Sequence, residues 1–144
     1  MKKIAVLLPY KDNFTNSNAG SASIWVKDFN KTSIYKNHIR VFGNTIFFKD
    51  LIDKKRYRNL NLNKNTFGSK NVSYVKEFLK ISKKEEFELI EIHNRPSYAH
   101  QILKDSNNEK IVLIFHNNPL TLGGSKSLEE RKVLLERCKN LVFV

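Results

Sequence analysis

The chain has 144 residues, which is enough for one domain of ordinary size but not for two. It is 40% hydrophobic and 28% charged, close to the globular average, which excludes an extensively disordered or fibrous protein. No apolar run approaches the roughly 20 residues of a membrane-spanning helix. The basic start is followed by too short an apolar stretch for a signal peptide. A cytoplasmic domain is therefore the expectation.

The net charge of +12 is unevenly distributed along the chain. Residues 1–72 carry 14 basic and 4 acidic side chains, whereas residues 73–144 carry 12 and 10. An excess of this kind indicates an anionic partner, such as a phosphate, a membrane surface or a nucleic acid. A compositional bias toward lysine and asparagine that keeps the chain soluble explains it equally well. The single Cys138 excludes an internal disulfide and a cysteine-based zinc site.

The first third of the chain reads as a strand, a loop and a helix. Residues 3–9 form an apolar run that ends at a proline, which is typical of a strand buried on both faces of a parallel sheet. A polar loop containing Gly20 follows. Apolar side chains then repeat at helical spacing: Ala22, Trp25, Val26 and Phe29. This succession favours the first unit of a nucleotide-binding type of βαβ fold.

The next stretch is harder to interpret. Residues 38–43 predict a second strand, and residues 45–48 predict a third short strand or an extension of the second. The basic, asparagine-rich segment 49–68 is expected to be a surface excursion. Ser69 is placed to cap a helix. The apolar face of that helix is predicted to consist of Val72, Val75, Phe78 and Leu79.

The second half alternates clearly between strands and helices. Strands are predicted at 87–93, 110–116 and 141–144, and a helix begins at Pro96. That helix is expected to bury Tyr98, Ala99, Ile102 and Leu103. Ser127 and Glu130 fit the capping box of a last helix. Its expected buried residues are Leu128, Leu134, Leu135 and Cys138. The whole pattern predicts an α/β domain with a Rossmann-like, mainly parallel sheet and helices on both faces.

Two histidines stand at equivalent positions of this predicted sheet. His93 and His116 each end a strand, and each is followed by an asparagine, Asn94 or Asn117. Ligands of open parallel sheets gather beyond the carboxyl ends of the strands. We therefore expect both imidazoles in a shared groove beside the turn at Gly20. There a histidine can bond a sugar hydroxyl or a phosphate, although capping a helix is the plainer alternative.

The turn at Gly20 and Ser21 leads into a helix, where backbone N–H groups can receive a phosphate. It lacks the further glycines of a Rossmann fingerprint and the Gly-Lys-Ser/Thr of a Walker loop, so simple helix capping is an alternative. A second glycine-containing loop precedes Lys126, whose charge could face a ligand. No His-x-x-x-His spacing supports a metal site.

Several segments resemble one enzyme family. Ile-Glu-Ile-His-Asn-Arg-Pro at 90–96, Phe-His-Asn-Asn-Pro at 115–119, Gly-Ser-Lys-Ser at 124–127 and the last strand are similar to the N-terminal domain of bacterial GT-B glycosyltransferases of family 4. The resemblance implies one half of a GT-B architecture, without the donor-binding half and incomplete at its C-terminal end. It implies transfer of a hexose from a nucleotide sugar to a glycan or lipid-linked acceptor in cell-surface polysaccharide or lipopolysaccharide synthesis. Such transfer is retaining and uses no metal or cofactor, and little activity is expected from this chain alone.

The resemblance also assigns roles to residues. It makes His116 the catalytic residue beside the reacting sugar, and it gives Gly20 and Ser21 contacts to the donor phosphates. The acceptor side would be lined by His93, Asn94, Arg95, Asn117 and Lys126. Two positions depart from the family pattern, since Ala19 stands where a second glycine is common and Asn117 where aspartate or threonine is common.

The basic first half of the chain is compatible with two kinds of partner, an anionic membrane surface and a nucleic acid or other polyanion. For a transferase, residues Lys49–Lys64 are expected to make peripheral contact with the anionic inner membrane face. The alternative function is a non-catalytic basic α/β domain that binds nucleic acid or another polyanion. The run Lys-Lys-Arg-Tyr-Arg at 54–58 would serve it through charge and a stacking tyrosine, with binding that weakens as salt rises.

Overall fold

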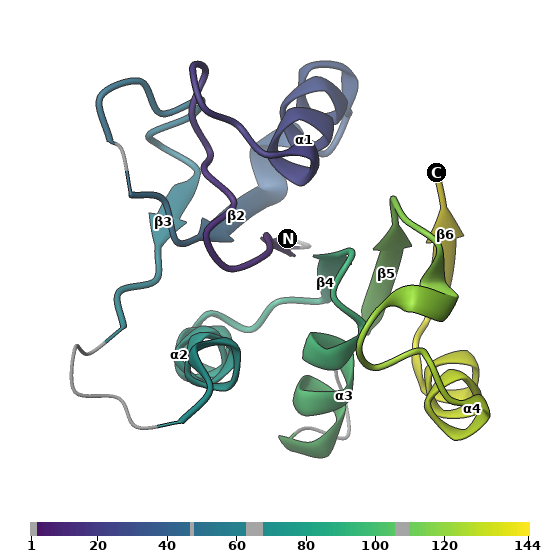
Figure 1. The fold of residues 1–144 in the computed structure, drawn as a ribbon. Coiled ribbons are helices and arrows are strands. Elements are labelled where there is room, and N and C mark those ends of the chain that lie inside the picture. Colours follow the sequence, from purple (N-terminus) through teal and green to yellow (C-terminus); the bar gives the residue numbers. More distant parts are fainter. Residues whose placement is uncertain (1–2, 47, 63–67, 106–109) are drawn as a thin grey trace.

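The computed structural model describes residues 3–46, 48–62, 68–105 and 110–144 (Figure 1). Six strands form one sheet in the order β3-β2-β1-β4-β5-β6, and every neighbouring pair is parallel. The strands are β1 (Ile4–Leu7), β2 (Ile39–Gly43), β3 (Tyr57–Asn59), β4 (Leu89–His93), β5 (Ile111–Phe115) and β6 (Asn140–Phe143). The strand order reverses direction between β1 and β4, which is where folds of this class bind ligands.

Helices cover both faces of this sheet (Figure 1). The α-helices are α1 (Ser21–Thr32), α2 (Lys70–Glu85), α3 (Pro96–Asp105) and α4 (Leu128–Arg137), with short 3-10 turns η1 (Lys36–His38) and η2 (Pro119–Thr121). Helix α1 lies on one face, and α2, α3 and α4 lie on the other. The prediction of a Rossmann-like α/β domain with a parallel sheet is therefore confirmed.

Two hydrophobic cores follow from the alternation of side chains along each strand. On β1, Ala5 and Leu7 face the larger core under α2, α3 and α4, whereas Val6 and the following Leu8 face the smaller core under α1. All four side chains are at most 1% exposed. Since β1 and β5 are covered on both faces, their sequences are apolar throughout, which is why these strands could be recognised.

The third strand is not at residues 45–48, as predicted, but at Tyr57–Asn59, inside the segment expected to be a surface excursion. Tyr57 stacks on Phe14 of the first loop with ring centroids 5.4 Å apart, and its hydroxyl donates to Thr45 Oγ1 at 2.7 Å. The backbone N–H of Thr45 donates to the side chain of Asn59 at 2.8 Å. These contacts hold the residues around Thr45 across the end of β3. The strand beside β2 is therefore β3 and not residues 45–48. Residue 47 lies outside the described residues.

The buried face predicted for α3 is confirmed, whereas the buried faces of α2 and α4 differ from the prediction. In α2, Val72 is 42% exposed, and the fully buried Tyr74 donates its hydroxyl hydrogen to the Leu8 carbonyl at 2.9 Å. In α4, Leu134 is buried, whereas Leu128 and Leu135 are 56% and 69% exposed. Helix α4 packs beside α3 and β6 at the end of the sheet, so only one narrow stripe of it is covered.

Two predicted local features are settled by the structure. The capping box of α4 is confirmed, because Glu130 N–H donates to Ser127 Oγ at 3.1 Å and Ser127 N–H to Glu130 Oε2 at 3.0 Å. Cys138 follows α4 and packs, half-buried, against the larger core. Burial raises the pKa of its thiol to about 11.

Within the described ranges, no helix is long and apolar enough to cross a bilayer.

The basic segment is partly neutralised inside the fold. Arg56 pairs with Asp53 at 2.5 Å and Arg58 with Glu85 at 2.8 Å. Tyr57 of β3 stacks on Phe14 of the first loop and bonds Thr45 and Asn59, so its ring is not offered to a nucleic-acid base. Lys54 and Lys55 are exposed. Lys64, at the end of the expected membrane contact, lies outside the described residues.

Candidate functional site

Strands β4 and β5 bring the two histidines together at the carboxyl edge of the sheet. Their register pairs His93 with Ile114, and His116 lies two residues beyond Ile114. Residues two apart on a strand point to the same face, so both imidazoles face α1, and so does Glu91, two residues before His93. Diagonal neighbours on adjacent strands lie within reach of long side chains. The sheet therefore places three polar side chains in a row under α1.

These three side chains are joined by hydrogen bonds. Nδ1 of His93 lies 2.9 Å from Nε2 of His116, and Nε2 of His93 lies 2.7 Å from Oε1 of Glu91. The His93 side chain has no exposed surface, and that of Glu91 is 13% exposed. Trp25 of α1 packs on both imidazoles, with ring centroids 5.2 Å from His93 and 5.9 Å from His116. Burial, and then the neighbouring His93, lower the pKa of His116.

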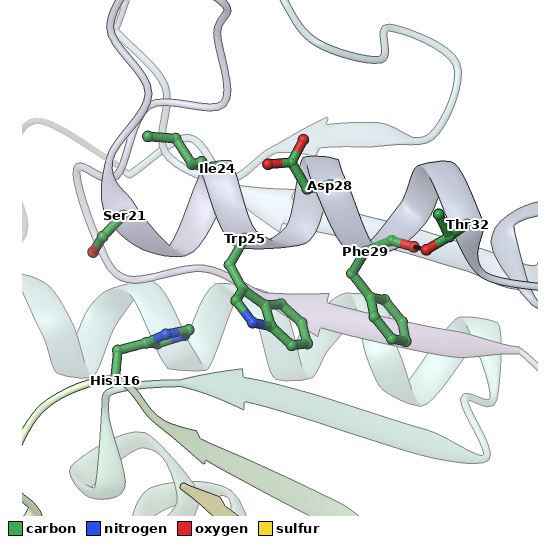
Figure 2. Close-up of a pocket in the computed structure, with 7 residues that line it drawn as sticks. All are labelled: Ser21, Ile24, Trp25, Asp28, Phe29, Thr32 and His116. Atoms are coloured by element: carbon green, nitrogen blue, oxygen red, sulfur yellow. Dashed lines mark hydrogen bonds between the residues drawn. The ribbon is translucent and has the colours of Figure 1, made fainter. Parts of the chain in front are cut away.

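His116 is the member of this row that reaches a cavity, which we call the helix cleft (Figure 2). The cleft has a volume of about 580 Å³ and runs along α1. It is lined by Ser21, Ile24, Trp25, Asp28, Phe29, Thr32 and His116. Trp25 and Phe29 stack with their centroids 5.0 Å apart, and Figure 2 shows both rings hanging from α1 on the side of His116. The cleft thus combines aromatic faces with a hydroxyl, a carboxylate and an imidazole.

A second cavity, the loop cleft, opens at the N-terminus of α1 and has a volume of about 500 Å³. Its lining comprises residues 9–13 and 18–22 together with Asn94, Arg95 and Asn117. Ser21 lines both clefts. Asn94 has a positive φ of 54° and is 9% exposed, and its Oδ1 is buried without a donor among the described residues. A buried acceptor without a donor is costly, which makes Asn94 a candidate contact for a ligand N–H or O–H.

The N-terminal end of α1, which was expected to receive a phosphate, already holds a carboxylate beside it. Ser23 donates its hydroxyl hydrogen to Oδ1 of Asp12 at 2.5 Å. A Cβ atom at position 20 would come within 2.5 Å of the Asp12 carboxylate, so the glycine is needed for close approach. Negative charge is stabilised at a helix N-terminus. Asp12 therefore lies at the place where the family resemblance implies a donor phosphate, and the two negative charges would repel each other.

This arrangement predicts that Asp12→Asn strengthens phosphate binding at the loop cleft. Removing one negative charge from beside the site is worth about 1 kcal/mol, or roughly a fivefold fall in Kd. Titration of the chain with inorganic pyrophosphate in a calorimeter measures it. Asp28→Asn is the matched control, since it removes the same charge from an exposed ion pair on α1. Equal affinities of the two variants would place phosphate elsewhere.

The predicted site residues fall into three groups: those that line the loop cleft, those that line the helix cleft and those that line neither. Gly20, Ser21, Asn94, Arg95 and Asn117 meet at the loop cleft, and His116 faces the helix cleft. His93 lines neither cleft and contacts His116 and Glu91 instead. Lys126 is exposed and lines neither cleft. The preceding Gly124 packs against the start of α3, where its carbonyl lies 2.7 Å from His100 Nε2.

Sequence reasoning missed three residues of the site. Glu91 was recognisable in part, because a charged residue inside an apolar strand and two positions from a histidine must share its face. Trp25 was assigned only to the apolar stripe of its helix. Asp12 carried no signal, because its contact with α1 depends on how the polar loop folds back.

No protein-family model matches the chain, and no curated protein matches it. Within the described ranges, no three His, Cys, Asp or Glu side chains are grouped so that they could hold a metal ion. The groups available are hydrogen-bonding side chains, backbone N–H groups and aromatic faces.

Proposed function

We propose that this domain is the acceptor-binding half of a retaining, metal-independent glycosyltransferase of the GT-B type. It would help transfer a hexose from a nucleotide sugar to a glycan or lipid-linked acceptor. The observation that carries the proposal is the convergence of His93–Asn94, His116–Asn117 and the Gly20 turn at one edge of the sheet. The resemblance of residues 90–96 and 115–119 to family 4 supports the same reading.

The chemistry of the two clefts suits a carbohydrate. Sugars present hydroxyl groups that donate and accept hydrogen bonds, and the loop cleft offers Asn13, Asn18, Asn94, Asn117 and Arg95 to them. Sugars also present flat C–H faces, for which Trp25 in the helix cleft provides an aromatic surface. The alternative of nucleic-acid binding draws less support, because Arg56 and Arg58 are paired and Tyr57 is packed inside the fold.

The proposed reaction needs a second half-site. The bond between the sugar's anomeric carbon and the donor diphosphate breaks, a bond to an acceptor oxygen forms, and the acceptor's proton leaves with the diphosphate. The barrier falls when the reactants are positioned and the charge of the departing diphosphate is stabilised. The residues of the two clefts would position the acceptor, and His116 would lie beside the reacting sugar. The cationic groups for the diphosphate belong to the donor-binding half that the resemblance implies.

We expect simple sugars to bind at the loop cleft. Titrating the ¹⁵N-labelled chain with methyl glycosides of common hexoses should shift the backbone signals of Gly20, Ser21 and Asn94. Asn94→Ala should abolish those shifts, because it removes the buried Oδ1 atom that lacks a hydrogen-bond donor. Asn37→Ala, an exposed asparagine in η1, is the matched control and should bind as the unmodified chain does. Shifts confined to the basic segment, or produced only by a short DNA duplex, would contradict the proposal in favour of polyanion binding.

A further inference from the structure

Glu91 is an unusual residue for its position. It lies in the middle of β4, where its register partners are Val6 on β1 and Val112 on β5. A mostly buried carboxylate is costly unless it is paired, and the contact that pairs this one is Nε2 of His93 at 2.7 Å. A carboxylate can only accept hydrogen bonds. The hydrogen of His93 is therefore fixed on Nε2.

That assignment determines the next hydrogen bond in the row. A neutral His93 with its hydrogen on Nε2 has a bare Nδ1, which can only accept. Its partner at 2.9 Å, Nε2 of His116, must then be the donor. A neutral His116 that donates from Nε2 has no hydrogen on Nδ1. The two imidazoles lie nearly parallel, 14° apart, and Trp25 packs on both.

We propose that Glu91 and His93 are positioning residues that hold His116 in the neutral Nε2–H tautomer, so that its Nδ1 accepts a hydrogen bond from a ligand hydroxyl. This proposal deepens the proposed function and rests on it for the identity of that ligand. The direction of each hydrogen bond is nevertheless a property of the free chain. Glu91 thus acts on the helix cleft without lining it.

The groups around His116 determine how readily its neutral Nε2–H form takes up a proton. Burial and the adjacent His93 favour the neutral form and lower the pKa of His116, whereas Asp12 and Glu91 act in the opposite direction. Asp28 lines the same cleft from α1. When His116 takes up a proton, its Nδ1 also carries a hydrogen. Acidification therefore converts the cleft end of the row from an acceptor to a donor.

The tautomers can be read directly from ¹⁵N chemical shifts of the histidine rings, with His116→Gln to assign the signals. At neutral pH, His93 and His116 of the unmodified chain should both show a protonated Nε2 and a bare Nδ1. Glu91→Gln removes the acceptor-only group, so both histidines should become mixtures whose two nitrogen shifts approach each other. Loss of the negative charge should also lower the pKa of His116, because the Glu91 carboxylate is one of the groups that raise it.

Glu88→Gln is the matched control, because it removes the same charge from an exposed residue just before β4. It should leave the His93 and His116 signals unchanged. A hydrogen on Nδ1 of His116 in the unmodified chain at neutral pH would overturn the proposal, and so would equal spectra of the two variants. If Glu91→Gln does not fold, the unmodified chain alone decides. Because no sugar is present, this result is independent of the hexose titration that tests the proposed function.

Discussion

Gly124→Ala should lower the free energy of unfolding by about 3 kcal/mol. Gly124 has a φ of +94°, which a residue with a Cβ rarely adopts. An added Cβ would also lie against the backbone nitrogen of Ser97 and 2.8 Å from the carbonyl carbon of Pro96. These atoms belong to the first turn of α3, so the helix itself would have to move. Urea unfolding followed by circular dichroism measures the change.

Gly123→Ala provides the control for this experiment. The two glycines are adjacent, but a Cβ at position 123 would have no atom within 4 Å and no positive φ to oppose it. That substitution should change the unfolding free energy by less than about 0.5 kcal/mol. If both variants were equally stable, the loop would not be packed on α3 as described.

The contact between Gly124 and the start of α3 helps to position the residues of the loop cleft. Helix α3 begins at Pro96, directly after Asn94 and Arg95, which line the loop cleft. The sequence singled out this glycine-containing loop because it precedes Lys126, yet Gly124 is needed for a close approach between two backbones. Tyr98 of the same helix accepts from the backbone N–H of Tyr10 at 3.1 Å and so also fixes the first loop. The start of α3 thus links both sides of the cleft.

The sequence predicted best what depends on local pattern. Central strands such as β1 and β5 are apolar in every position because both of their faces are covered, and this pattern also placed His93 and His116 at one edge. The capping box at Ser127 needed only four residues to be recognised. The meeting of the two imidazoles followed from strand direction alone, since parallel strands end at a common edge.

What the sequence could not predict depends on contacts between distant segments. Strand β3 has only three residues and is held by Phe14 and Thr45, which are far away in the chain. The carboxylate of Asp12 reaches α1 only after the polar loop has folded. The burial of His93 depends on Trp25 and Glu91, so its accessibility could not be inferred from its place at a strand end. Periodicity likewise gives the direction of a helix face but not how much of it a neighbour covers.

Leu134→Ala and Leu135→Ala test how much of one face of α4 is covered, because they compare the same substitution at two neighbouring positions. Leu134 is 1% exposed and packs in the larger core, so its truncation should cost about 3 kcal/mol of unfolding free energy through lost burial and the cavity left behind. Leu135 is 69% exposed, and its truncation should change the unfolding free energy by less than about 0.5 kcal/mol. Both changes have the same effect on helix propensity, so the difference in urea midpoint reports burial alone. A large loss at Leu135 would mean that this face of α4 is covered in solution, as the sequence pattern predicts.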